Sequence, residues 1–324
     1  MHRILPLDAA TYRRHAIHGE GRIWAETNCY SDVIVELLHG AGFEPAAALP
    51  FTLTIDHDVN HWTFFKFPHA DVSALYAWEI FEMAPWPTLY DCVEAQVAAG
   101  RPVLVELDSF FLPDTEGTAW RREHVKSTVA VNLLDRDARR MGYFHNQGYF
   151  ELQGEDFDDV FQLQGLVHPR MLPPYVEFVK PAPRRAPLRG AALVDGSLRL
   201  LREHLGRLPE SNPFPRFRAR FEHDAAALDG QGIEAFHAYA FVTLRMYGAN
   251  YELAATCLRW LAEQGVALPP EPGADLTWIS TNAKALQLQL ARAIVRRRPL
   301  DLAPLDEAAT RWDRAMGTLV GRFA

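Results

Sequence analysis

The stretch from Lys180 to Gly190 constrains the fold of this chain most, because it separates two parts with different residue patterns. It reads K-P-A-P-R-R-A-P-L-R-G, and its prolines remove backbone donors and fix φ. With 324 residues the chain is also long for a single domain. We therefore predict two domains, residues 1–180 and residues 181–324.

The second part has the pattern of a helical bundle. Leucines recur there at spacings of three and four residues, which places them on one face of a helix: Leu198, Leu201, Leu205 and Leu208. Similar patterns predict helices over Ile233–Tyr247, Tyr251–Gln264, Thr281–Arg297 and Leu305–Val320. A proline-rich stretch, Leu268–Asp275, predicts a linker between two of these helices.

The first part has a mixed pattern, with helices followed by strands. Asn28 opens an apolar run that predicts a helix to about His39, ended by glycines. Further helices are expected over Val72–Met83 and Leu89–Ala99. Runs rich in β-branched residues predict strands that start at Arg101 and that span His124–Asp135 and Met141–Asn146. This order indicates an α+β domain with an antiparallel sheet.

Composition excludes several classes of protein. The net charge of −8, without aromatic residues interleaved among basic ones, argues against nucleic-acid binding. No apolar run reaches about 18 residues, so no membrane span is expected. Three cysteines and an N-terminus without an apolar signal core favour a cytoplasmic protein. The paired histidines in D-H-D-V-N-H (56–61) look like part of a loop between strands, so we expect no metal site.

The charge is divided unevenly between the two parts. Residues 181–324 hold 19 Lys and Arg against 15 Asp and Glu, a net of +4, which leaves −12 for residues 1–180. Either the two domains complement each other across an interface, or the second domain helps to receive an acidic partner.

A cysteine at the head of a predicted helix is the main candidate for catalysis. Free backbone N–H groups and the helix dipole stabilise a thiolate at Cys29, and they can also hold an oxyanion. His124, at the mouth of a strand, is the candidate base, and Asn146, on the partner strand, is the candidate residue to orient the imidazole. Cys92 and Cys257 lie within apolar helical patterns and are expected to be core thiols.

Four blocks of sequence carry a resemblance to a known family. They are N-C-Y-S-D-V-I-V-E-L-L-H-G-A-G-F, G-R-P-V-L-V-E-L-D-S-F-F-L-P, H-V-K-S-T-V-A-V-N-L-L-D and Y-F-H-N-Q-G-Y-F-E-L. In this order they resemble the N-terminal domain of the butirosin biosynthesis protein H family, over roughly residues 20–165. That family is similar to papain-like cysteine enzymes, so the resemblance implies a papain-like first domain.

The resemblance also implies an activity. The family transfers an aminoacyl group from the phosphopantetheine thioester of an acyl carrier protein to an amine acceptor, with no cofactor on the enzyme itself. Cys29 would accept the acyl group and His124 would act as the base. Asn146 stands where many relatives carry an acidic residue, and His145 and Asp135 are alternative orienting residues. Asp108 matches a recurring position and would shape the site or bind the substrate amine.

One departure from papain-like enzymes concerns the oxyanion hole. Those enzymes place a glutamine about six residues before the cysteine, and here Ile23 holds that position. Asn28 or Thr27 could substitute, or the Cys29 N–H could act with another backbone donor.

Further side chains are candidates for substrate binding. Trp62, with Phe64, is expected in a loop that contacts substrate. Arg121 and Arg122 would suit a phosphopantetheine phosphate or an acidic carrier surface.

The sequence therefore predicts a cysteine-dependent acyltransferase whose second, helical domain narrows the pocket and excludes water. Two alternatives remain. One is a peptidase or amidase that uses the same residues with water as the acceptor. The other is a non-catalytic scaffold that binds a carrier protein or a small molecule.

Overall fold

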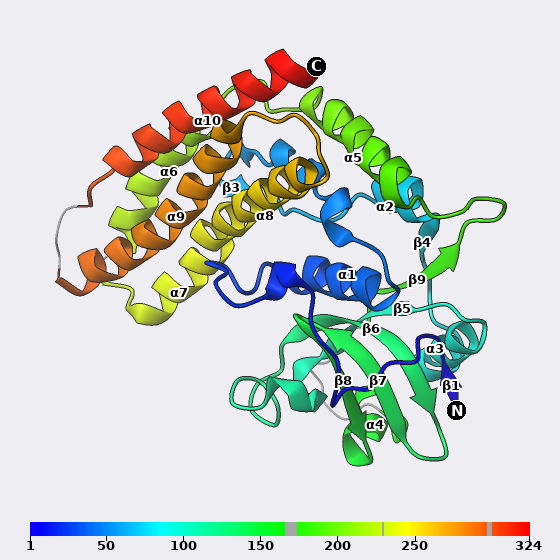
Figure 1. Ribbon diagram of the computed structural model, residues 1–324. Coiled ribbons are helices and arrows are strands. Elements are labelled where there is room, and N and C mark those ends of the chain that lie inside the picture. The colour runs from blue at the N-terminus through cyan, green and yellow to red at the C-terminus, as the bar shows by residue number, and fades with distance from the viewer. Residues whose placement is uncertain (166–173, 229, 297–299) are drawn as a thin grey trace. The chain divides into compact units, whose positions relative to one another are not determined.

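The computed structural model describes residues 1–165, 174–228, 230–296 and 300–324 (Figure 1). The chain forms two compact units. The first, here called the sheet unit, consists of Met1–Glu20, Asn28–Pro45 and His69–Pro187. The second, here called the helical unit, consists of Gly21–Thr27, Ala46–Pro68 and Leu188–Ala324. Two segments of the N-terminal part, Gly21–Thr27 and Ala46–Pro68, thus belong to the helical unit. A single division after residue 180 would assign them to the sheet unit.

The sheet unit is built on a seven-stranded antiparallel sheet, which confirms the predicted α+β class. Its strands run in the order β4-β9-β5-β6-β7-β8, and β1 pairs with β6. The strands are β1 (His2–Arg3), β4 (Trp78–Glu82), β5 (Val103–Asp108), β6 (Lys126–Asp135), β7 (Arg140–His145), β8 (Gly148–Gln153) and β9 (Val176–Pro181). The predicted strands β5, β6 and β7 are confirmed.

Helices pack on both faces of this sheet. Its helices are α1 (Cys29–Gly40), α2 (His69–Tyr76), α3 (Leu89–Ala98) and α4 (Glu155–Val160), with 3-10 turns η1 (Ala16–His18), η4 (Ser109–Phe111) and η5 (Pro113–Thr115). Helix α1 lies on the face that carries Phe144, whose ring fills the space beside Gly40. Helix α3 packs on the other face, in a cluster with Val129, Val131 and Tyr143. Side chains alternate between the faces along each strand, so odd-numbered residues from Ser127 to Val131 of β6 face away from α1.

Buried polar groups fix helix α1 against the N-terminal segment. His18 Nδ1 lies 2.5 Å from Glu36 Oε1, and His18 Nε2 lies 3.2 Å from Asp32 Oδ1. The Tyr12 hydroxyl donates to Glu36 at 2.6 Å. Burial lowers the pKa of His18, but the hydrogen bonds and charges of the two carboxylates outweigh it and raise that pKa to about 9.

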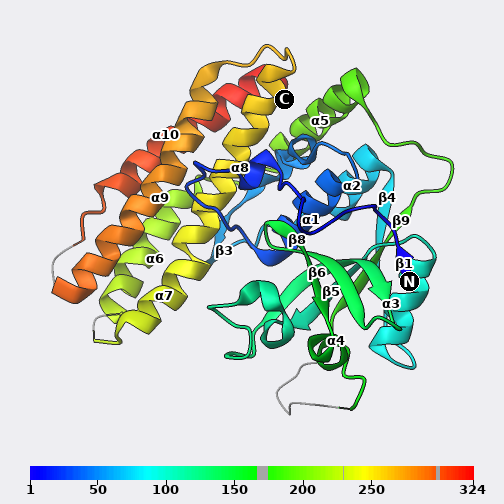
Figure 2. The same ribbon diagram turned by 60° about the horizontal axis from the view of Figure 1, so that its bottom comes forward.

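The helical unit confirms the prediction of an all-helical second part. Its helices are α5 (Gly190–Leu205), α6 (Pro213–Ala227), α7 (Ile233–Val242), α8 (Leu244–Glu263), α9 (Pro270–Arg296) and α10 (Ala303–Phe323). A two-stranded hairpin, β2 (His57–Asp58) with β3 (His61–Trp62), and the turns η2 (Pro45–Ala48) and η3 (Pro50–Thr54) precede them in the chain. Within this unit α6, α8, α9 and α10 run side by side (Figure 2).

Several predicted boundaries were wrong. The helix expected over Val72–Met83 ends at Tyr76, because residues 78–82 instead form β4 and pair with β9. The expected linker Leu268–Asp275 contains the start of α9, since prolines are tolerated in a first helical turn. The helix expected from Ile233 to Tyr247 is interrupted at Thr243, whose φ of −117° and ψ of −77° depart from the usual α-helical values of about −63° and −42°. Helix α6 was not predicted, and the expected helix end at Arg297 lies outside the described residues.

In the part of the chain that the structure describes, every helix is too short or too polar to cross a membrane.

Candidate functional site

Cys29 is the first residue of helix α1, as predicted. Asn28 is the N-cap of this helix, with φ −152° and ψ 150°, and its side chain accepts a hydrogen bond from the Ser31 N–H at 2.9 Å. This cap fixes the first turn of α1, in which Cys29 is the first residue. The side chain of Asn28, a candidate for the oxyanion hole and for substrate binding, is buried and caps the helix.

The sulfur of Cys29 contacts a threonine of the central strand β6. Its thiol donates to Thr128 Oγ1 at 3.6 Å, and the cysteine is partly exposed. Thr128 is therefore the residue of β6 that faces the N-terminus of α1.

A histidine–aspartate pair lies at the start of the same strand. His124 Nδ1 is 2.7 Å from Asp108 Oδ2, and the second oxygen of Asp108 accepts from the Phe110 N–H at 3.0 Å. The Phe110 ring stacks on the imidazole, with centroids 4.3 Å apart and planes 8° apart. A carboxylate at Nδ1 favours the tautomer that leaves Nε2 ready to accept a proton.

The cysteine and the histidine–aspartate pair belong to the same face of the sheet. In the register of β5 and β6, Asp108 is opposite Lys126 and Glu106 is opposite Thr128. Because side chains alternate, Asp108 and Thr128 both face the side that α1 covers. The pair Asp108–Lys126 and the pair Glu106–Thr128 are two residues apart along β5. This corresponds to about 7 Å along the strand.

The residue that contacts Nδ1 of His124 is thus Asp108, not one of the three predicted orienting residues. Asn146 lies in the β7–β8 turn with φ +46°, one residue beyond the end of β7. Asp135 accepts from the Ala138 N–H in the turn after β6. The third candidate, His145, contacts Asp114 and Ser127 on the other face of the sheet. The sequence did not predict Asp108 as the residue that orients His124, because only the pairing of β5 with β6 brings the two side chains together.

The residue after the cysteine anchors the first turn of α1. The Tyr30 hydroxyl donates to Glu177 Oε2 at 2.7 Å and lies 2.9 Å from His69 Nε2. Tyr175 donates to the other oxygen of the same buried carboxylate at 2.9 Å. Burial, together with this hydrogen bond to Glu177, raises the pKa of Tyr175 to about 12. This cluster holds α1 to strand β9, and the sequence did not reveal it.

The two arginines ahead of His124 are engaged within the sheet unit. Arg121 pairs with Asp156 at 2.5 Å and with Asp159 at 3.2 Å, and its guanidinium lies 5.8 Å from the centre of the Phe110 ring. Arg122 donates to the Gly117 carbonyl at 3.0 Å and is exposed. The predicted phosphate-binding role would require Arg121 to exchange these carboxylates for the ligand.

Trp62, predicted to contact substrate, has a buried side chain. It lies in the predicted loop region, now seen as the β2–β3 hairpin, but its ring is buried in the core of the helical unit. Its centroid lies 5.5 Å from Phe214, 5.2 Å from Phe217 and 5.0 Å from Tyr247. A large aromatic side chain gains more from burial among these rings than from exposure on a loop.

Within the described residues, no group of three or more His, Cys, Asp or Glu is arranged to hold a metal ion.

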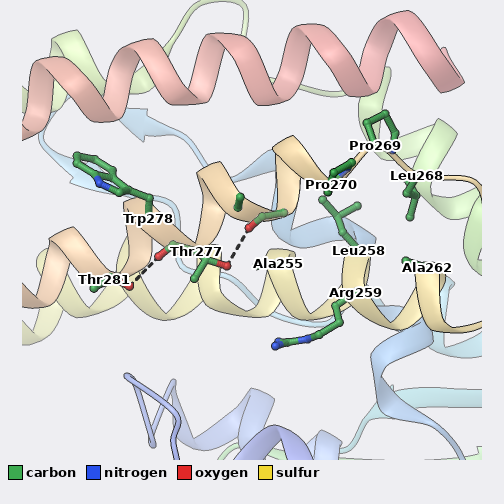
Figure 3. A pocket seen from close by; sticks show the side chains of 12 residues that line it. Ala255, Leu258, Arg259, Ala262, Leu268, Pro269, Pro270, Thr277, Trp278 and Thr281 are labelled. Atoms are coloured by element: carbon green, nitrogen blue, oxygen red, sulfur yellow. Dashed lines mark hydrogen bonds between the residues drawn. The ribbon is translucent and has the colours of Figure 1, made fainter.

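The helical unit contains a cavity of about 640 Å³ between α8 and α9 (Figure 3). Its walls are mainly apolar, and Arg259 stands at its edge with an exposed side chain. The lining residues are Ala255, Leu258, Arg259, Ala262, Leu268, Pro269, Pro270, Gly273, Ala274, Thr277, Trp278 and Thr281.

Comparison with protein families gives two matches. Residues 13–181 match the DUF1839 N-terminal domain, and residues 190–321 match the DUF1839 C-terminal domain. The chain belongs to the DUF1839 family. Among the curated proteins no match was found.

In this DUF1839 chain the first match includes Cys29, Asp108 and His124. The second begins at residue 190, where α5 begins. The candidate site therefore lies within the residues of the DUF1839 N-terminal domain.

Proposed function

We propose that the sheet unit is a papain-like cysteine acyltransferase with Cys29 as its nucleophile and His124 as its base. The observation that carries this proposal is the 2.7 Å hydrogen bond between His124 and Asp108 on the face of the sheet that α1 covers. It supplies the base and the orienting group that a nucleophilic cysteine needs. The resemblance to the butirosin biosynthesis protein H family supplies the substrate class.

The first half-reaction transfers the acyl group to the enzyme. His124 Nε2 accepts the Cys29 proton, and the thiolate attacks the carbonyl carbon of a thioester carried by the phosphopantetheine of an acyl carrier protein. The Cys29 N–H, at the head of α1, stabilises the oxyanion. Collapse of this intermediate breaks the bond to the pantetheine sulfur, which leaves as a thiol after protonation by His124. The exchange of one thioester for another requires little help for the leaving group.

The second half-reaction regenerates the cysteine. A small-molecule amine attacks the acyl-cysteine carbonyl, and His124 accepts the proton that the amine nitrogen loses. The new amide forms as the bond to Cys29 breaks, and the thiolate is restored. Asp108 stabilises the imidazolium that exists between these steps.

A specific observation favours a second candidate, a non-catalytic module that binds a carrier protein. The Cys29 thiol donates to Thr128, and a threonine hydroxyl cannot serve as a base at neutral pH. In this second function Cys29 is a first-turn residue of α1 whose thiol is not activated.

Intact mass spectrometry with aminoacyl thioesters of pantetheine tests the proposal. We expect one acyl adduct on Cys29, absent from Cys29→Ala and retained in the matched Cys92→Ala variant. After removal of the donor, discharge by an amine supports transfer. Rapid decay in buffer, unchanged by any amine, would indicate a hydrolase. A protein that acquires no adduct would support the binding module.

A further inference from the structure

A second nucleophile–base–carboxylate set occupies the opposite face of strand β6. Ser127 Oγ lies 2.6 Å from His145 Nε2, and His145 Nδ1 lies 2.6 Å from Asp114 Oδ2. The other oxygen of Asp114 accepts from the Tyr143 hydroxyl at 2.5 Å. We propose that this set is a serine acyl-hydrolase site, in which Ser127 is the nucleophile and His145 is the base.

The polarity of the hydrogen bonds supports this assignment. A buried histidine can satisfy its two nitrogens in many ways, and a satisfied polar network is common in protein cores. Here the carboxylate takes Nδ1 and the hydroxyl takes Nε2, which is the arrangement that lets an imidazole withdraw a proton from serine. Tyr143 holds the Asp114 carboxylate in place, so Asp114 is a positioning residue.

The side chains of His145 and Asp114 are 1% and 4% exposed, and Ser127 is also buried, with 8% of the whole residue exposed. Ser127 is the second residue of β6, close to the end of the strand. Val125, two positions earlier in the chain, is apolar and 43% exposed. The substrate that we propose for this site is an ester with a short apolar acyl group.

The reaction balances with water as the second substrate. Ser127 Oγ forms a bond to the ester carbonyl carbon while His145 Nε2 takes its proton. The intermediate then expels the alcohol, which receives that proton. Water attacks the acyl-serine next, its proton passes to His145, and the carboxylic acid leaves as Ser127 recovers its hydrogen. This site does not use Cys29, which contacts Thr128 on the other face.

A fluorophosphonate probe tests this inference on the full-length chain. The experiment is done in the Cys29→Ala variant, so that the probe cannot react with Cys29. The result for Ser127 is therefore independent of whether Cys29 is a nucleophile. We expect one adduct on Ser127, located by peptide mapping. The adduct should be lost in Ser127→Ala. It should be retained in Thr128→Val, because the Thr128 hydroxyl is adjacent in the chain but lies on the other face of the sheet.

His145→Gln should slow labelling by about 100-fold or more, as expected for loss of a general base. Circular dichroism would establish that the variants are folded. Labelling of Ser127 in the Cys29→Ala protein leaves Ser127, His145 and Asp114 unchanged. This part of the test therefore holds even if His145→Gln does not fold. No adduct at Ser127, under conditions that fully label a known serine hydrolase, would overturn the inference. An adduct that persists in Ser127→Ala would do the same.

Discussion

Replacement of Asp108 by asparagine isolates the role of the histidine–aspartate pair. The asparagine oxygen can still accept from the Phe110 N–H, a bond of 3.0 Å in the native protein. Its NH₂ group would then face Nδ1 of His124, which at present lies 2.7 Å from the carboxylate. This reverses the favoured tautomer, so that Nε2 carries the proton and cannot accept one from Cys29.

The expected effects on the reaction rate and on stability differ in size. Loss of general-base catalysis slows acylation of Cys29 by about 10²–10⁴-fold, and the lower limit corresponds to about 2.7 kcal/mol. The side chains of His124 and Asp108 are 23% and 10% exposed, so water partly replaces the lost hydrogen bond. The loss of stability should therefore be about 1–1.5 kcal/mol, at or below the lower limit for a hydrogen bond to a charged group.

The assay is the single-turnover rate of acyl-enzyme formation, followed by intact mass. Denaturant unfolding of the same sample reports the change in stability. Glu106→Gln is the matched control, because Glu106 is the neighbouring carboxylate on the same face of β5 and pairs with Lys126. An acylation rate in Asp108→Asn equal to that of the control would refute the assignment of the pair as base and orienting group.

Two further predictions concern stability. The pKa of His18 is raised from 6.5 to about 9, so its contribution, about 3 kcal/mol, is complete below pH 6.5 and is lost as pH rises through about 9. Urea unfolding between pH 6 and pH 10 should show this loss, and His18→Gln should flatten the profile; an equally steep profile would assign the effect to other groups. Gly248→Ala should destabilise the chain by about 1–3 kcal/mol, since the new Cβ would lie 2.5 Å from the Trp24 ring. Gly317→Ala, where the structure places nothing within 4 Å, should leave stability unchanged or raise it, and equal effects of the two substitutions would contradict this packing.

Features set by local sequence were predictable. Helix α1 begins at Cys29 because Asn28 caps it, and both residues are adjacent in the chain. The hairpin of β6 and β7 also follows from a short turn between two runs of β-branched and aromatic residues. The basic, proline-rich stretch was also recognisable as the connection to the helical part, which follows with α5 from Gly190.

Features set by distant pairing were not predictable. Residues 78–82 form a strand because they pair with β9, about 100 residues later in the chain. Asp108 reaches His124 only through the register between β5 and β6, and a chain read residue by residue gives no such register. Trp62 is buried by helices that begin 150 residues further on, so its local sequence suggested an exposed loop.

The rate at which iodoacetamide alkylates each cysteine tests the central claim most directly. Cys92 is an internal control, because it is also partly exposed and lies in the first turn of a helix, with its sulfur 3.2 Å from the Trp86 carbonyl. Burial raises the pKa of Cys257 to about 12, so that thiol should react last. The account predicts that Cys29 reacts well before Cys92 at neutral pH, and that His124→Gln removes this difference. Equal rates for Cys29 and Cys92 in the native protein, or a Cys29 rate unchanged by His124→Gln, would contradict a nucleophilic cysteine activated by histidine.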